Sequence, residues 1–203
     1  MSQPNAFRAR LLLIGLLLVP APSLAEDRSG DGPVAPVERK SPAAIRADQL
    51  DRMFARLHGA ADSETASLAE KNIWALWMAS DSPTAEVLMQ QAIRAMNEGA
   101  FAPALSILNR LIGANPDYAE AWNKRATLYF MMGRYEESLA DIDRVLDLEP
   151  RHFGALAGRG MIYRKQENYG AALEAFRRAL AINPNMPGVK DAISEIDSLQ
   201  QPI

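Results

Sequence analysis

Residues 119–152 read AEAWNKRATLYFMMGRYEESLADIDRVLDLEPRH, and this stretch decides the fold. Apolar side chains recur in it at spacings of three or four, the period of one helix face; they are Trp122, Ala126, Tyr129, Leu139, Ile142 and Leu146. Gly133 separates two such patterns and suits a tight turn, because a residue without Cβ adopts positive φ at little cost. Pro150 ends the second pattern, since it lacks an N–H and clashes with the preceding turn. The stretch therefore predicts a helical hairpin that cannot bury its apolar face alone.

The pattern repeats along the chain with a step of 34 residues. Pro150 has counterparts in Pro116 and Pro184, and Tyr135 has counterparts in Phe101 and Tyr169. Three tandem units follow, at residues 85–118, 119–152 and 153–186. Hairpins that repeat at such a step bury a continuous core by stacking on their neighbours.

These units resemble the tetratricopeptide repeat (TPR) family, whose pattern is Trp-x2-Leu-Gly-x2-Tyr, then Ala-x3-Phe, then Pro. The chain departs from the pattern where Arg125 and Arg159 replace Leu, Ala95 replaces Tyr and Ser138 replaces Ala. None of these changes removes the helix–turn–helix pattern. The resemblance implies an all-α TPR solenoid with a right-handed superhelical sense.

Helical patterns also flank the three repeats. Residues 43–80 predict a degenerate helical hairpin, with Ser41-Pro42 as its N-cap and first helical position. We expect this hairpin to cap the exposed end of the first repeat, as solenoids require. The alternative is that Trp74 and Trp77 form an exposed patch for a partner. Residues 187–203 predict a C-terminal capping helix, about 189–200, and a tail.

The N-terminus has the pattern of a secretory signal. Arg8 and Arg10 precede the apolar run 11–19, and Ser23-Leu24-Ala25 places small residues at the cleavage site. We expect cleavage after Ala25, because the run is about half of the ~20 residues of a membrane-spanning helix; a retained anchor is the alternative. Residues 26–42 are rich in Pro, Gly and charge and predict a flexible linker. Export without any Cys predicts a bacterial periplasmic protein.

Charge and motifs exclude several classes of function. The formal net charge is −3, and no Lys/Arg cluster is present to neutralise phosphates, which argues against nucleic-acid binding. His58 and His152 have no spaced His, Cys or carboxylate partner, so we expect loop or capping roles for them rather than metal ligation. No spacing pairs a nucleophile with a base. We predict no catalytic residue, no metal, no cofactor and no enzyme activity.

Arg125 and Arg159 occupy the same position in consecutive repeats, where a stacked helix surface is largely buried. A buried guanidinium requires a carboxylate partner. We expect Asp141 or Asp143 to pair with Arg125, and Glu174 to pair with Arg159. An anion-binding pair that faces a ligand is the alternative.

The TPR resemblance implies that the first helix of each hairpin lines a concave groove. It assigns to this partner-binding groove Met89, Ile93, Asn123, Thr127, Phe130, Met161 and Arg164. TPR domains that grip the C-terminal carboxylate of heat-shock chaperones carry Lys and Asn where this chain has Met89 and Ile93, so that clamp is absent. We expect an apolar groove with Asn123 as its backbone-holding side chain. Whether residues 43–80 cover this groove is left open by the sequence.

The chain is also similar to small exported TPR proteins of the envelope of Gram-negative bacteria, particularly alphaproteobacteria. Together these patterns predict a periplasmic adaptor that binds a peptide or helix of an envelope protein and supports envelope assembly or integrity. The alternative is a structural homo-oligomer, or a non-catalytic subunit of an envelope complex. A groove occupied by another copy of the chain, visible as a concentration-dependent mass, would distinguish the homo-oligomer from the adaptor.

Overall fold

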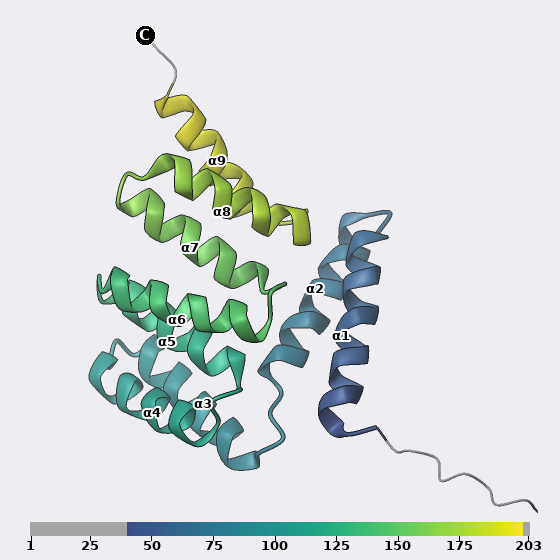
Figure 1. Cartoon of the computed structure of the whole chain (residues 1–203), viewed down its shortest axis with the longest axis vertical. Helices are drawn as coiled ribbons and strands as arrows, with labels where there is room; N and C mark the ends of the chain where they lie inside the picture. Colours follow the sequence, from purple (N-terminus) through teal and green to yellow (C-terminus); the bar gives the residue numbers. More distant parts are fainter. Residues whose placement is uncertain (1–39, 201–203) are drawn as a thin grey trace, which may run out of the picture. The chain divides into compact units, whose positions relative to one another are not determined.

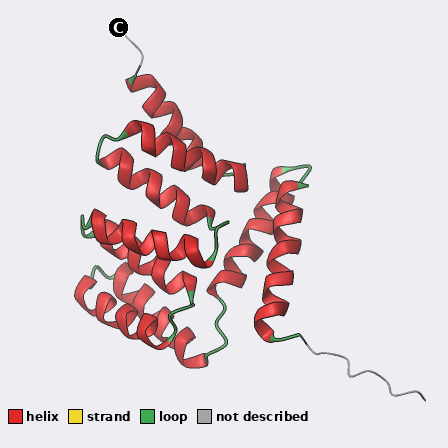
Figure 2. Ribbon diagram, viewed as in Figure 1, coloured by secondary structure: helices red, strands yellow, loops and turns green. Residues whose placement is uncertain are grey.

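The computed structural model describes residues 40–200. The predicted signal peptide at 1–25 and nearly all of the predicted linker at 26–42 lie outside the described residues. Over the described range the chain forms nine α-helices and no strand (Figures 1 and 2). The predicted all-α fold class is confirmed.

Each predicted repeat folds as two antiparallel helices joined by a short turn (Figure 1). The pairs are α3 (Pro83–Asn97) with α4 (Phe101–Ala114), α5 (Ala119–Met131) with α6 (Tyr135–Leu148), and α7 (Phe153–Lys165) with α8 (Tyr169–Ile182). The turns place Gly99, Gly133 and Glu167 at positive φ, with φ of 71°, 74° and 58°. These residues are spaced by the 34-residue repeat step. Glu167 in the third turn therefore adopts the same left-handed conformation as the two glycines, although its Cβ makes this conformation sterically unfavourable.

The repeats share a core because each first helix also packs against the preceding repeat. Ala121 and Leu128 of α5 are buried in the same apolar cluster as Leu108 and Leu111 of α4. Ala155 and Ile162 of α7 join Ile142 and Val145 of α6 in the next cluster. Helix α9 (Pro187–Leu199) closes the array by burying Val189, Ala192 and Ile196 against α8.

The N-terminal hairpin consists of α1 (Pro42–His58) and α2 (Ser63–Met78). Ser41 caps α1 by accepting from the Ala44 N–H at 3.2 Å, and Pro42 occupies the first turn, as the sequence predicts. Asp62 caps α2 by accepting from the Thr65 N–H at 2.7 Å. These caps satisfy amide groups that a helix start leaves without an internal partner.

The position of the hairpin differs from the expectation of a cap stacked on the first repeat. Helix α2 lies against the start of α5 and α7, so the hairpin crosses the repeats instead of extending their stack (Figure 1). Three of its contact residues share one repeat position, the last loop residue before α5, α7 and α9. This loop row consists of Tyr118, His152 and Met186, spaced by 34 residues.

Aromatic packing explains why the hairpin takes this position. Trp77 stacks on His152 with ring centroids 4.1 Å apart, and Trp74 meets Phe153 edge-on at 5.5 Å. Phe153 is fully buried within the hairpin's own apolar cluster. Gly154 leaves room for Trp74, because a Cβ on Gly154 would lie 2.5 Å from the Trp74 ring. The two Trp side chains therefore bind the repeats of the same chain.

Candidate functional site

The structure gathers four of the seven predicted groove residues around one hollow of about 130 Å³ between α5, α6 and α7. We call it the inner hollow, and its predicted lining residues are Asn123, Thr127, Phe130 and Met161. Its other lining residues are Ala126, Ser138, Ile142, Gly154, Ala155, Gly158 and Ile162. Small-molecule and cofactor sites usually occupy about 300–1,000 Å³. The inner hollow therefore has the size of a pocket for one side chain.

The lining of the inner hollow is mostly apolar, and its two hydroxyl groups bond to the backbone. Thr127 Oγ1 donates to the Asn123 carbonyl at 2.9 Å, and Ser138 Oγ donates to the Ala126 carbonyl at 2.7 Å. Thr127 is exposed, whereas Phe130 and Met161 are half-buried. These two hydroxyl groups therefore stay paired when an apolar group enters the hollow.

The other three predicted residues lie elsewhere. Met89 is buried in the core of the first repeat, and the half-buried Ile93 packs against the same core. Arg164 forms an ion pair with Glu195 of α9. The seven residues therefore do not line one continuous groove.

Asn123 belongs to a buried polar cluster below the hairpin. It is 8% exposed, and its Nδ2 donates to Glu120 Oε2 at 3.0 Å. The fully buried Glu120 carboxylate also lies 2.8 Å from Lys124 Nζ and 3.1 Å from His152 Nε2. The expectation that His152 has no carboxylate partner is therefore wrong, because a stacked repeat brings together residues 32 positions apart.

His152 has its predicted capping role as well. Its Nδ1 accepts from the Ala155 N–H at 3.0 Å at the start of α7. Because an accepting Nδ1 carries no proton, Nε2 is the protonated nitrogen and donates to Glu120. The imidazole thus connects the carboxylate, the helix start and the Trp77 ring.

Two opposing effects set the pKa of the Glu120 carboxyl. Burial raises this pKa, but the hydrogen bond from His152 and the charge of Lys124 outweigh burial, so the pKa lies below its ordinary value. Glu120 is therefore an ionised carboxylate at neutral pH. The cluster anchors the hairpin to the repeats, since Trp77 covers His152 and Lys124 lies over the Trp74 ring at 5.8 Å.

The two repeat arginines form structural ion pairs. Arg125 donates from Nε and Nη2 to both Asp141 oxygens at 2.8 Å, which confirms one of the two partners expected for it, and from Nη1 to Asn109 at 2.8 Å. Arg159 pairs with Asp143, so the expectation of Glu174 is wrong. Asn109 and Asp143 are 34 residues apart, on the second helices that precede the two arginines. Adding 34 to both residue numbers of the Arg125–Asn109 contact gives the Arg159–Asp143 pair, so the repeat spacing predicts one contact from the other.

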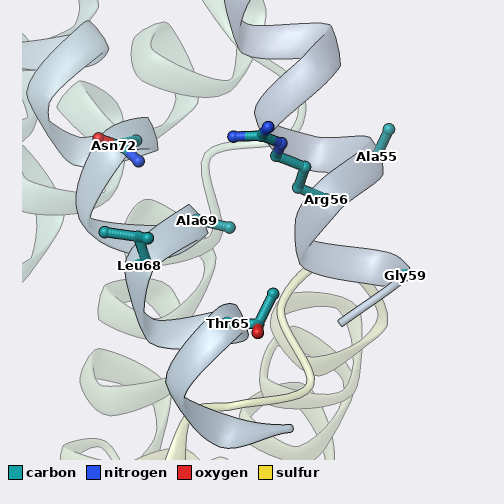
Figure 3. Close-up of a pocket in the computed structure, with 7 residues that line it drawn as sticks. All are labelled: Ala55, Arg56, Gly59, Thr65, Leu68, Ala69 and Asn72. Atoms are coloured by element: carbon teal, nitrogen blue, oxygen red, sulfur yellow. The ribbon is translucent and has the colours of Figure 1, made fainter. Parts of the chain in front are cut away.

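A second hollow, of about 490 Å³, lies on the hairpin. Figure 3 shows Arg56 of α1 pointing across it toward α2, where Thr65, Leu68 and Asn72 line it. It contains none of the residues that the sequence selects, and its only charged lining side chain is Arg56. We therefore do not treat this hollow as the candidate site.

From residue 40 to residue 200, no group of three or more His, Cys, Asp or Glu side chains is placed to hold a metal ion. None of the helices in this range is both long and apolar enough to cross a membrane.

A stack of helix–turn–helix units with an inner face between first helices defines the class of helical repeat proteins. The tetratricopeptide repeat family model matches residues 89–140 and 124–187. A TPR repeat-containing protein of Rhizobium etli is 39% identical over 103 residues, which make up 51% of this chain and 50% of that protein. This chain thus spans about half the length of that relative. The chain is a tetratricopeptide-repeat protein.

Solved structures share the fold. The first TPR domain of Spaghetti (RPAP3), bound to an HSP90 peptide, superposes with a TM-score of 0.56 and 20% identity, covering 59% of this chain and 94% of that one. The Sgt2 TPR domain from Aspergillus fumigatus superposes with a TM-score of 0.55 and 19% identity, and the match covers 60% of this chain and 81% of that one. The second TPR domain of human RPAP3, in complex with an HSP70 peptide, superposes with a TM-score of 0.51 and 23% identity, and the match covers 54% of this chain and 92% of that one.

Proposed function

We propose that this protein is an adaptor that binds a helix or extended segment of a partner protein on its inner face. The observation that carries the proposal is the inner hollow, where Thr127, Phe130 and Met161 surround an apolar space of about 130 Å³. A space of this size fits one apolar side chain, and peptide segments dock on helical grooves through such anchors. We infer that a Leu, Met or Phe side chain of the partner enters the hollow.

The manner of recognition differs from a grip on a terminal carboxylate. Two structural neighbours are bound to HSP90 and HSP70 peptides. In this chain the positions at which related TPR domains carry Lys and Asn are Met89, which is buried, and Ile93, which is half-buried. Neither side chain can donate a hydrogen bond to a carboxylate. The partner segment is therefore held by apolar contact and can come from the interior of a sequence.

The proposed setting is the bacterial periplasm, and the proposed partner is a protein of the cell envelope. This part of the proposal rests on the signal-like residues 1–25 and on the absence of Cys from the sequence. It predicts that the protein isolated from its cell of origin begins at Glu26 and is released by osmotic shock. An N-terminus at Met1 and retention in the cytoplasm would contradict it.

The binding site is tested by two substitutions at Thr127. Thr127→Arg places a long charged side chain at the hollow, whereas Thr127→Ala removes only a hydroxyl that bonds to its own helix. With both variants and the wild type as bait in envelope extracts, we expect a partner that Thr127→Ala retains and Thr127→Arg loses by at least about tenfold. Equal recovery on all three baits would place the binding surface elsewhere.

A further inference from the structure

The first helix of the array, α3, exposes positions that its counterparts bury. Ala121 and Leu128 of α5 pack against the preceding repeat, and Ala155 and Ile162 of α7 do the same one repeat later. Thirty-four residues before Ala121 and Leu128 stand Val87 and Arg94 of α3. The Val87 side chain is 56% exposed, and Arg94 is exposed too. The side of α3 that would contact a preceding repeat is therefore uncovered.

The N-terminal hairpin does not fill this side, because α2 turns away to pack on α5 and α7. The end of α2 reaches α3 through Met78, which packs against the core of the first repeat, and the Ser80 N–H beyond α2 donates to Glu86 Oε1 at 3.4 Å. Between them lies an open hollow of about 620 Å³. Its α3 side is formed by Pro83, Glu86, Val87, Met89, Gln90 and Arg94. We call Glu86, Val87, Gln90 and Arg94 the α3 edge.

The α3 edge has a charge pattern that is complementary to itself. Glu86, Gln90 and Arg94 follow one another at intervals of four residues, so they form one stripe along the helix. If a second α3 packs antiparallel on this stripe with Gln90 at the centre, Glu86 of each copy faces Arg94 of the other. The two ion pairs would lie about 12 Å apart, at 1.5 Å per residue. Val87 would contribute apolar contact beside them.

We propose that the α3 edge is a dimerisation surface, and that its occupant is the α3 edge of a second copy of this chain. A two-fold contact requires one patch that pairs with itself, and the Glu86–Gln90–Arg94 stripe meets this requirement. Head-to-tail stacking would instead place the α3 edge against α9, which covers the other end of the array and exposes Lys190, Asp191 and Asp197. That contact would not place Glu86 opposite Arg94, so paired charge reversals distinguish it from the two-fold contact. The dimer leaves the inner hollow free.

Charge reversal tests this pairing in the full chain. Sedimentation equilibrium from about 1 to about 500 μM covers the range of weak self-association. The wild type is expected to approach twice the monomer mass as its concentration rises. Glu86→Arg and Arg94→Glu each place like charges opposite one another at both ion pairs, so each should raise the dimer dissociation constant at least about tenfold.

Two combinations make the test specific for an antiparallel two-fold contact. The double variant Glu86→Arg/Arg94→Glu should dimerise like the wild type, because both pairs are restored with reversed sign. An equimolar mixture of the two single variants should form a mixed dimer as tightly as the wild type dimerises, although each variant alone dimerises at least about tenfold more weakly. Glu174→Arg, an equal charge change on the exposed face of α8, should leave the dimer unchanged.

Three results would overturn the proposal. The first is a wild type that stays monomeric at every concentration. The second is a dimer that both single reversals leave intact. The third is a mixture of the single variants that remains monomeric. Thermal unfolding of each variant separates these results from misfolding, since both positions are exposed and both variants should melt as the wild type does.

Discussion

At the scale of single residues, Gly154 sets how closely the hairpin approaches the repeats. A Cβ at this position would lie 2.5 Å from Trp74 Cη2 and 3.0 Å from Cζ2. The indole cannot easily move away, because its ring packs edge-on against Trp77, His152 and Phe153. We expect Gly154→Ala to lower the free energy of unfolding by about 1–3 kcal/mol, measured by urea unfolding.

Gly158, one turn further along α7, is the matched control. A Cβ there would lie 3.6 Å from Ile142 Cδ1, an ordinary van der Waals contact. Gly158→Ala should therefore leave stability unchanged or raise it by up to about 1 kcal/mol, because Ala favours a helix interior. Equal effects at both glycines would show that Trp74 does not pack on Gly154.

The two repeat arginines give a second matched pair. Asp141, the partner of Arg125, has a side chain that is 6% exposed, whereas that of Asp143, the partner of Arg159, is 70% exposed. Removal of Arg125 leaves a carboxylate buried without its cation, which is costly, whereas an exposed ion pair contributes little. We expect Arg125→Met to destabilise by about 2–4 kcal/mol and Arg159→Met by less than about 1 kcal/mol in urea unfolding. A larger loss at Arg159 would contradict this assignment.

Glu120 gives the fold a dependence on pH. Its pKa is lower in the fold than in the unfolded chain, whose ordinary value is about 4.3. The ionised carboxylate therefore adds stability above this value, and that stability is lost as the pH falls through it toward the folded pKa. The groups that face the carboxylate are His152, Lys124 and Asn123.

Glu120→Gln isolates this effect, because Gln has the same shape and does not titrate. We expect the wild type to be more stable than Glu120→Gln at pH 7, with a difference that shrinks between about pH 5 and pH 3. Unfolding in urea at a series of pH values measures it. A difference that is constant over this interval, or that grows as the pH falls, would contradict the assignment.

At the scale of elements, Trp74 holds the hairpin on the repeats. Trp74→Ala removes the edge-on contact with Phe153 and His152 while leaving the Phe54–Trp77 contact inside the hairpin. We expect faster amide hydrogen exchange in α1 and α2, and little change in α3 and α4, because local opening follows the loss of local contacts. Leu68→Ala, at an exposed position of α2, should change neither region. Uniformly faster exchange would indicate that the hairpin and the repeats unfold together.

The helices and their repeat spacing could be predicted from the sequence because they depend on local patterns. Apolar side chains at helical spacing, a turn residue such as Gly133 and the recurrence of Pro150 each act within a few residues. The position of the hairpin depends on contacts far apart in the chain. The helical spacing of Trp74 and Trp77 is compatible both with a cap stacked on the first repeat and with a hairpin that crosses the repeats, so it does not distinguish the two positions. Aromatic residues at one loop position, Tyr118 and His152, are the signal that marks this contact.

The partners of buried charges were only partly predictable for a related reason. Asp141 lies in the same hairpin as Arg125, so the pattern within one repeat is enough to suggest this ion pair. Asp143 lies in the hairpin before Arg159, and the sequence does not say to which side an arginine turns. Likewise, Glu120 and His152 meet only because consecutive first helices stack. Thr127, Phe130 and Met161 meet at one hollow for the same reason, and their role in binding stays a prediction.

At the scale of the whole molecule, the inner face is divided between two uses. Residues near the start of α5 and α7, including Glu120 and His152, hold the chain's own hairpin. Residues nearer the ends of these helices, Thr127, Phe130 and Met161, line the inner hollow, where we propose that a partner binds. The α3 edge lies at the start of the array, so a dimer would present two inner hollows. Two linked sites would increase the avidity for a partner with repeated segments.

The most direct test of the central claim is photo-crosslinking in the cell of origin, with a photoreactive amino acid at Thr127. The matched position is Glu174, which is exposed on α8, outside the inner hollow. We predict that position 127 reproducibly captures one heterologous envelope protein, that position 174 does not, and that peptide mapping places an apolar side chain at the crosslink. Capture of the same proteins at both positions, or none at position 127, would contradict a binding site on the inner face.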